Sequence, residues 1–322
     1  EHTSRGLGDV YKRQVAHHLM KTSKISVSPE NVLITPGAKQ ALLYSYMTVL
    51  NPSDEAILLS PSWASYEPMI SIIGGVPVNV PVDRKNFHPD MDAIRSSITD
   101  RTRMIMVNSP CNPTGAVYTR EEIEEIVSIA IEHDLWIISD EIYSRLIWNG
   151  GEHVSPATIE GGKERTIVIS GWSKTWAMTG MRVGFLAGPE QAVRAAVKCQ
   201  ANSASHIPTF MMEAARVALD CDDHVERFSD AYRHRRNLIV QGLEDIPGLR
   251  IVNPEGAFYL FIDVTGTGMS DVQFADGALK AGVQLIPASL ITGGEGFIRV
   301  SYAASEEDIK EGINRLRSWL LE

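Results

Sequence analysis

The stretch "VISGWSKTWAMTGMRVG", residues 168–184, places a single lysine, Lys174, shortly after a β-branched apolar run. A glycine-punctuated segment with one arginine, Arg182, follows the lysine. Lysine is among the residues that are least often buried, so Lys174 alone would indicate an exposed loop cation. The alternative is a reactive amine held in a pocket. The rest of the chain has to decide between the two.

Short apolar runs alternate with helical patterns over the first two thirds of the chain. The predicted strands cover residues 31–35, 56–60, 76–80, 103–107, 135–139, 166–170 and 183–187. Residues 120–134 carry a strong helical period. Strands that are apolar on both faces and alternate with helices predict an α/β fold with a mainly parallel central sheet covered by helices. Ligands bind to such sheets beyond the carboxyl ends of the strands.

The pattern changes towards the C-terminus. A basic helix predicted over residues 231–248 leads to predicted strands at 257–263 and 296–302 and to a closing helix. We therefore predict a large domain over residues 15–231 and a smaller C-terminal α+β domain over residues 232–322.

The first residues have an unusual composition. "SRGLGDVYKRQ", residues 4–14, resembles the in-frame translation of a sequencing adaptor. We predict that residues 1–14 are a non-native segment, that the native start of the chain is missing, and that function lies in the remainder.

Bulk properties narrow the class of protein. Among the 322 residues, 44% are hydrophobic and 22% are charged, which is ordinary for a globular protein. The formal net charge of -10 argues against nucleic acid or an anionic membrane as a partner. No apolar run approaches the roughly 18 residues of a transmembrane helix. Cys111, Cys199 and Cys221 lack metal-type spacing, so they predict reduced thiols in a cytoplasmic protein without a metal site.

An acid, an amide and an amine follow three of the predicted strands, and a glycine leads from a fourth strand into a helix. They are Asp140, Asn112, Lys174 and Gly37. A helix cap, a turn and a backbone hinge are ordinary alternatives for Asp140, Asn112 and Gly37. Because the carboxyl ends of parallel strands meet at one edge of a sheet, we expect all four to face one crevice.

One ligand needs all four groups. Pyridoxal phosphate has an aldehyde that a lysine binds as a Schiff base, and a pyridine nitrogen that stays protonated beside a carboxylate. Two unit charges 4 Å apart attract by about 4 kcal/mol at an effective dielectric constant of about 20, which raises the pKa of the ring nitrogen. The phosphate needs backbone N–H groups at a helix N-terminus, which Gly37, Ala38 and Lys39 would supply, together with a cation such as Arg182.

Six motifs together resemble the class I pyridoxal-phosphate aminotransferases of fold type I, nearest the aspartate aminotransferase type. They are "TPGAKQAL" (35–42), "SPSWASYEPM" (60–69), "NSPCNPTGAVY" (108–118), "SDEIY" (139–143), "SGWSKTWAMTGMRVG" (170–184) and "GFIRVSYAAS" (296–305). The match runs from about residue 15 to the C-terminus. It implies a fold-type-I large domain, pyridoxal phosphate as cofactor, amino-acid and 2-oxo-acid substrates, and a homodimer with shared active sites.

The resemblance implies a role for each residue of the chemistry. Lys174 would form the Schiff base and then act as general base, while Asp140 would pair with the pyridinium nitrogen. Asn112 and Tyr143 would hydrogen-bond the phenolic oxygen of the cofactor. Trp63 would stack on the cofactor ring, with ordinary packing beneath a loop as the alternative.

The resemblance also implies where the phosphate and the substrate bind. Ser173 and Arg182, with Gly37, Ala38 and Lys39, would hold the phosphate. The substrate α-carboxylate would be gripped by Arg299, with Asn112 beside it. An interior ion pair is the alternative for this mid-strand arginine, which would be costly to bury without an anionic partner.

Three departures from the family pattern stand out. Gly171 occupies a position where many relatives have a phosphate-binding serine, and Trp172 is larger than the usual residue. The N-terminal arm of the family, and the tyrosine that the following segment sends to the neighbouring subunit, are not recognisable. We therefore expect weaker cofactor binding or weaker dimerisation of this chain.

The function expected from the resemblance is transamination by a ping-pong mechanism through pyridoxamine phosphate, with aspartate or glutamate favoured. A carbon–sulfur β-lyase or a cyclase on the same scaffold is one alternative, because the cofactor does the chemistry. A non-catalytic ligand sensor is another. His206, in "QANSASHIPTF" (200–210), is either a substrate contact or a surface or interface residue.

Overall fold

The structure, a computed structural model, describes residues 2–148, 150–290 and 294–321. Its centre is a seven-stranded sheet with the strand order β1-β7-β6-β5-β4-β2-β3. The strands are β1 (Val32–Thr35), β2 (Glu55–Ser60), β3 (Val76–Pro81), β4 (Thr102–Asn108), β5 (Trp136–Asp140), β6 (Thr166–Gly171) and β7 (Gly184–Ala187). Each one begins and ends within one residue of the run that the sequence predicted.

The direction of the strands follows from their connections. β3, β2, β4, β5 and β6 pair in parallel, which confirms the mainly parallel sheet. β7 runs antiparallel to both β6 and β1. Only residues 172–183 join β6 to β7, and they contain no crossover helix of the kind that joins parallel neighbours.

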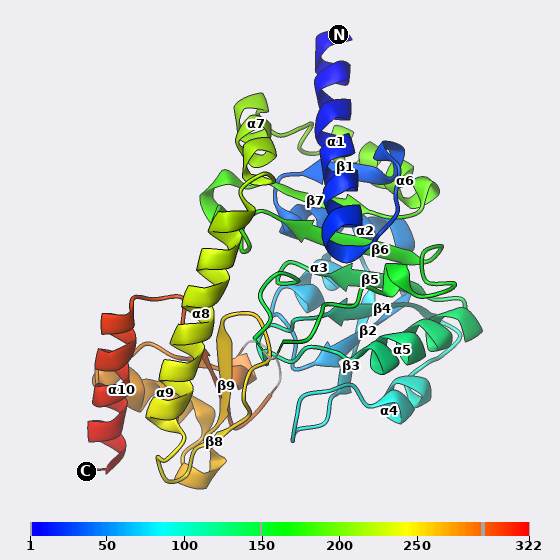
Figure 1. The fold of residues 1–322 in the computed structure, drawn as a ribbon. Helices are drawn as coiled ribbons and strands as arrows, with labels where there is room; N and C mark the ends of the chain where they lie inside the picture. The colour runs from blue at the N-terminus through cyan, green and yellow to red at the C-terminus, as the bar shows by residue number, and fades with distance from the viewer. Residues whose placement is uncertain (1, 149, 291–293, 322) are drawn as a thin grey trace.

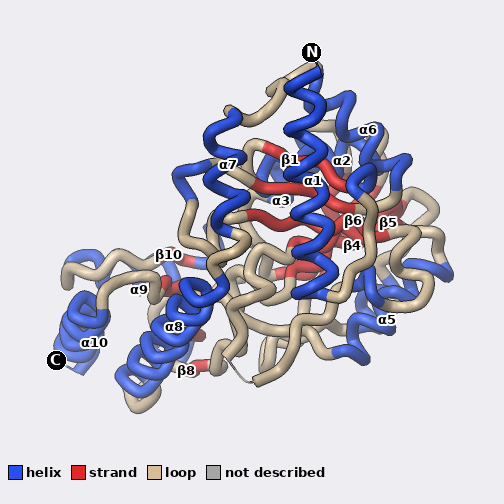
Figure 2. Tube along the Cα trace, turned by 45° about the horizontal axis from the view of Figure 1, so that its top comes forward, coloured by secondary structure: helices blue, strands red, loops and turns tan. Residues whose placement is uncertain are grey.

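Helices cover both faces of this sheet (Figures 1 and 2). They are α1 (His2–Ser23), α2 (Ala38–Val49), α3 (Tyr66–Ile72), α4 (Met91–Ser96), α5 (Arg120–Glu132), α6 (Glu190–Ala201) and α7 (Thr209–Ala218). Along β4, Met104 and Met106 pack with α2 and α6, whereas Ile105 and Val107 pack with α5. Both faces of the strand are therefore buried, which explains its unbroken apolar sequence.

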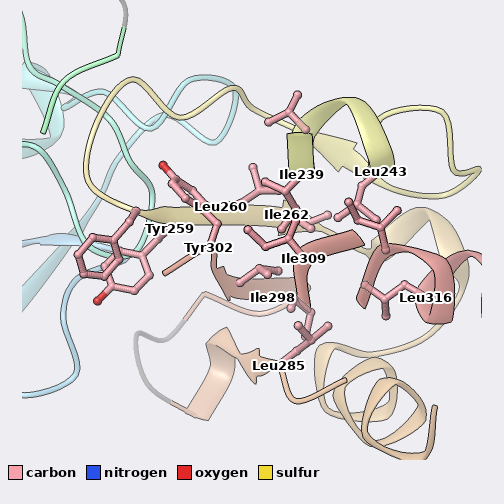
Figure 3. Close-up of a cluster of buried hydrophobic side chains, with 14 of the residues drawn as sticks. Ile239, Leu243, Tyr259, Leu260, Ile262, Leu285, Ile298, Tyr302, Ile309 and Leu316 are labelled. Carbon is pink, nitrogen blue, oxygen red and sulfur yellow. The ribbon is translucent and has the colours of Figure 1, made fainter. Parts of the chain in front are cut away.

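A second, antiparallel sheet lies at the end of the molecule away from the N-terminus (Figure 1). Its order is β10-β11-β9-β8, and α8, α9 and α10 accompany it. The elements are α8 (Asp222–Leu243), β8 (Arg250–Ile251), β9 (Tyr259–Asp263), α9 (Asp271–Lys280), β10 (Ile286–Pro287), β11 (Phe297–Ser301) and α10 (Glu306–Leu321). Figure 3 shows Ile262 and Ile298 of this sheet packed with Ile239 of α8 and Ile309 of α10.

The predicted division at residues 231 and 232 falls inside α8, which continues across it as one helix. The division of the chain into domains stays a prediction, as does the origin of residues 1–14. Within the described residues, no helix combines the length and the apolar character that a membrane crossing requires.

His88 connects the part of the molecule around the seven-stranded sheet with the part around the four-stranded sheet. Its Nδ1 lies 2.8 Å from Oε1 of Glu122, which also closes the capping box at the start of α5 with Thr119. On the other side, Nε2 lies 3.4 Å from Oε2 of Glu255, in the segment that leads to β9. The hydrogen bonds with Glu122 and Glu255 raise the pKa of His88 to about 9. The protonated ring therefore bridges two carboxylates at neutral pH.

We predict that His88→Gln lowers the free energy of unfolding by about 1 to 2 kcal/mol at pH 6, since the ring is partly open to solvent. The pKa of the folded state lies above that of the unfolded state. The contribution of His88 is therefore complete below about pH 6.5 and is lost as the pH rises through about 9.

Denaturant unfolding of both proteins between pH 6 and pH 10 measures this difference. His234→Gln, at an exposed position of α8, is the control. A difference between wild type and His88→Gln that stays constant across this range would contradict the bridge.

Candidate active site

A cavity of about 240 Å³ opens at the carboxyl ends of the parallel strands. All the predicted site residues except Gly37 and Arg299 line it. The lining residues are Ala38, Lys39, Leu42, Trp63, Tyr66, Asn108, Asn112, Asp140, Ile142, Tyr143, Ser173, Lys174, Arg182 and Tyr259. One crevice therefore collects residues that lie far apart in the sequence, as expected from the parallel strands.

Asp140 is the acid of this cavity. It is the last residue of β5, and its side chain is buried. Burial raises the pKa of its carboxyl to about 6, although the hydrogen bonds to the carboxylate oppose this shift. Tyr66 Oη donates to Oδ2 at 2.8 Å, and the backbone N–H of Ile142 donates to Oδ1 at 3.2 Å. The Asn108 amide donates to the Asp140 carbonyl, so the acid is held at both ends.

Lys174 lines the same cavity and is not an exposed loop cation. Burial lowers the pKa of its amine, and the nearby charges of Arg182 and Arg299 lower it further. The negative charge of Asp140 acts in the opposite direction. A lysine amine is a nucleophile and a base only when it is neutral, so this environment favours reactivity.

Arg299 reaches the edge of the cavity from the middle of β11. Its Nη1 donates to Oδ1 of Asn112 at 3.1 Å, and its guanidinium carbon lies 4.9 Å from the centre of the Tyr259 ring. Among the residues that the structure describes, no carboxylate lies within salt-bridge distance of Arg299. The alternative of an interior ion pair therefore finds no partner there.

β7 packs closely against the start of α2 at Gly184 and Gly37, and this contact is the glycine corner of the cavity. Gly37 precedes the helix with φ +83°, and a Cβ atom there would lie 2.6 Å from Nη2 of Arg182. A Cβ atom on Gly184 would lie 2.4 Å from the backbone nitrogen of Ala38. The first N–H groups of a helix lack intrahelical acceptors, so this corner offers donors and one guanidinium to an anion.

The sequence profile of the family described as "Aminotransferase class I and II" matches residues 4–316. The chain belongs to this family. This aminotransferase is 38% identical to the "Aspartate/prephenate aminotransferase" of Thermus thermophilus, over 94% of this chain and 79% of that protein. It is 39% identical to "Aromatic-amino-acid aminotransferase 2" of Thermococcus litoralis, over 100% of this chain and 84% of that protein.

Solved structures agree with this assignment. The aspartate aminotransferase of Thermus thermophilus with maleate superposes with a TM-score of 0.92 at 37% identity, covering 97% of this chain and 82% of that one. The aromatic aminotransferase of Pyrococcus horikoshii gives 0.94 at 37% identity, covering 98% and 85%. The aminotransferase is a transaminase of fold type I, and its cofactor is pyridoxal phosphate.

The cavity fits that cofactor. A phosphate suits the glycine corner, because the space that Cβ atoms would occupy at Gly37 and Gly184 is needed for the close approach of Arg182 and the first turn of α2. A buried carboxylate and a partly buried amine share the cavity. These are the groups that a pyridine nitrogen and an aldehyde require.

The structure explains two departures of this aminotransferase from the family pattern. Trp172 is buried, its Nε1 donates to the Ala215 carbonyl at 2.8 Å, and its ring lies 5.9 Å from that of Trp176. It anchors the start of the Lys174 loop to the core beneath α1 and α7. Gly171 faces the β7 backbone, where a Cβ atom would lie 2.8 Å from the Gly184 Cα. A serine does not fit there without movement of β7.

Three residues with polar side chains line the cavity and were not predicted to have a role. Tyr66 holds Asp140, Asn108 holds both Asp140 and the Asn112 backbone, and Tyr259 contacts Arg299. Asn108 could have been predicted from the sequence, because it follows the predicted strand 103–107 just as Asp140 follows the predicted strand 135–139. Tyr259 lies in the apolar run 257–262, and Tyr66 is the first residue of the helix α3, so both resemble core residues. His206 is exposed and is not among the residues that line the cavity.

We predict that Gly184→Ala weakens cofactor binding at least tenfold and destabilises the protein by about 1 to 3 kcal/mol. The new methyl group would press on the backbone at the start of α2 and separate Arg182 from the helix N–H groups. Gly180→Ala, in the loop that precedes β7 and with open space around it, is the control. Fluorescence titration with pyridoxal phosphate measures cofactor binding, and thermal unfolding measures stability. Equal affinity and stability of the two variants would contradict the role of the glycine corner in cofactor binding.

Proposed function

We propose that this aminotransferase transfers the amino group of a dicarboxylic L-amino acid, aspartate or glutamate, to a 2-oxo acid. The observation that carries this proposal is a spare cation, Lys39, on the wall of the cavity.

The cofactor half of the site uses the buried groups. Asp140 would hold a proton on the pyridine nitrogen, and Tyr143 and Asn112 would bind the phenolic oxygen. When bound, pyridoxal phosphate supplies an electron sink for the bond that breaks at the substrate α-carbon. Lys174 would take the proton from that carbon as general base, a role that its lowered pKa supports.

The phosphate would bind at the glycine corner. Arg182 and Ser173 would contact it, together with the backbone of Gly37, Ala38 and Lys39. Trp63 lines the cavity, where it would cover one face of the cofactor ring. Residues that are rigid and close to backbone therefore hold the part of the ligand that does not change during turnover.

The substrate half of the site uses two cations. Arg299 would bind the α-carboxylate with the N–H groups that Asn112 leaves free. The Lys39 amine lies 4.9 Å from the centre of the Trp63 ring, and its side chain is exposed. No carboxylate of the described residues lies within salt-bridge distance of Lys39. A second carboxylate on the substrate is the partner that this amine lacks.

We also propose that the protein is a cytoplasmic homodimer. Ile72, in the helix that follows the Trp63 segment, is 79% exposed, and Phe210 on α7 is 69% exposed. Exposed apolar side chains gain free energy when a second copy of the chain covers them. Cys111, Cys199 and Cys221 are free thiols, in agreement with a reducing compartment. Sedimentation at micromolar concentration would show a mass near 35.5 kDa if the chain were a monomer.

We predict that Lys174→Ala lowers the transaminase rate by about 10³-fold or more, because the general base is lost. The variant should also lose the visible absorption of the lysine-linked cofactor. Lys280→Ala, at an exposed position of α9, is the control and should retain both. Retained turnover in Lys174→Ala would defeat the assignment of this lysine.

A single-turnover experiment separates the transaminase from a lyase. Aspartate added to the cofactor-loaded protein should give oxaloacetate and leave the amino group on the protein, without release of ammonia. In a parallel reaction with cysteine, which carries a sulfur leaving group on its β-carbon, release of pyruvate together with ammonia and sulfide would contradict the proposed reaction.

We predict that Lys39→Gln raises the KM for aspartate by about tenfold, which corresponds to about 1.4 kcal/mol of lost attraction. The KM for leucine should change less than twofold, because leucine has no second carboxylate. The affinity for pyridoxal phosphate should also stay constant, since only the Lys39 backbone contacts the phosphate. Equal effects on both amino acids would contradict the substrate assignment.

A further inference from the structure

We propose that Tyr259 is a positioning residue for both halves of the reaction. Its ring holds Arg299 for the substrate carboxylate, and its hydroxyl orients Tyr143 for the cofactor oxygen. The proposal rests on the roles of Arg299 and Tyr143 proposed above. It adds a residue that neither the sequence motifs nor the family resemblance singled out.

The strand register brings Tyr259 to Arg299. Residues Arg299 and Ser301 point to the same face of β11, and Ser301 pairs with Tyr259 on β9. Tyr259 is therefore the diagonal neighbour of Arg299, a spacing that aromatic and long side chains can bridge. Figure 3 shows Tyr259 and Leu316 at opposite ends of the hydrophobic cluster. Tyr259 also lines the cavity.

The ring of Tyr259 fixes the guanidinium without neutralising it. The guanidinium carbon lies 4.9 Å from the ring centre, and Asn112 accepts one N–H bond at 3.1 Å. A carboxylate in place of either contact would compete with the substrate for the same N–H groups. An aromatic face and an amide oxygen hold the arginine in place and leave its other N–H groups free.

The hydroxyl of Tyr259 has a second task. Its oxygen lies 3.1 Å from the Tyr143 oxygen, and both side chains are buried. Each hydroxyl has one hydrogen to donate, so only one of the two can donate within this pair. If Tyr259 donates to Tyr143, the Tyr143 hydrogen is free for the phenolic oxygen of the cofactor. Two hydrogen bonds in a row also strengthen each other.

Two substitutions separate these tasks. Tyr259→Phe keeps the ring and removes the hydroxyl, whereas Tyr259→Leu removes both. Phe274→Leu is the structural control, because Phe274 of α9 lies in the same hydrophobic cluster as Tyr259 but packs on Trp319, 5.0 Å away. All three are measured as cofactor-loaded proteins by spectroscopic pH titration and by competition with succinate, an unreactive dicarboxylate.

For Tyr259→Phe, we expect the pH midpoint of the visible cofactor absorption to rise by about 0.5 units, because the phenolic oxygen loses part of its donor and holds the linkage proton more strongly. The dissociation constant of succinate should change less than twofold. For Tyr259→Leu, the same shift should appear together with about fivefold weaker succinate binding. Phe274→Leu should show neither effect.

An unchanged midpoint in Tyr259→Phe, or wild-type succinate affinity in Tyr259→Leu, would overturn the proposal. The same two effects in Phe274→Leu would do so as well, because a general loss of packing would then explain them. Arg299→Lys distinguishes this failure from a failure of the proposed function. If Arg299→Lys leaves succinate binding unchanged, the assignment of the α-carboxylate site is wrong. If it weakens binding while Tyr259→Leu does not, only the role of Tyr259 is wrong.

Discussion

The removal of one carboxylate and one amine from water is the constraint on which this site depends. Burial raises the pKa of Asp140 and lowers that of Lys174, so each group is moved towards its neutral form. Tyr66 and the Ile142 N–H oppose the rise in the pKa of Asp140, because they donate hydrogen bonds to its carboxylate. The positive charges of Arg182 and Arg299 lower the pKa of the Lys174 amine further. The acid is held as an anion for a cationic partner, while the amine is poised to exchange a proton.

This electrostatic arrangement requires a particular backbone. Asp140 ends β5 between the parallel strands β4 and β6, so its side chain emerges from a buried edge of the sheet. The short loop that joins β6 to the antiparallel β7 stays beside the cavity and brings Arg182 against Gly37. Such close approach is possible because the opposing positions on β6 and β7, Gly171 and Gly184, have no side chains.

The sequence predicted the sheet well, because a strand buried on both faces has an unbroken apolar run. It also predicted where the polar strand ends meet, since that follows from parallel pairing. It did not reveal that Tyr259 faces the cavity, because an aromatic residue in an apolar run has the same pattern whether it faces the core or a ligand. Tyr66 was missed because a tyrosine that begins a helix has the pattern of an ordinary packing residue. The role of Trp172 was hidden for another reason, since its partner, the Ala215 carbonyl, is a backbone group that any residue supplies. The antiparallel direction of β7, by contrast, could have been predicted from the short loop that precedes it.

Recognition of cofactor and recognition of substrate place different demands on the same residues. Under the proposed function, the phosphate would bind backbone N–H groups at the glycine corner, where nearly any added atom would collide. The Lys39 side chain points away from that constraint, since it is exposed and lies on the Trp63 ring. One residue can therefore serve the cofactor through its backbone and the substrate through its side chain. An exchange of that side chain alters the charge of the cavity wall and leaves the phosphate donors in place. Substrate preference can thus change in this fold without disturbing the buried groups that carry the chemistry.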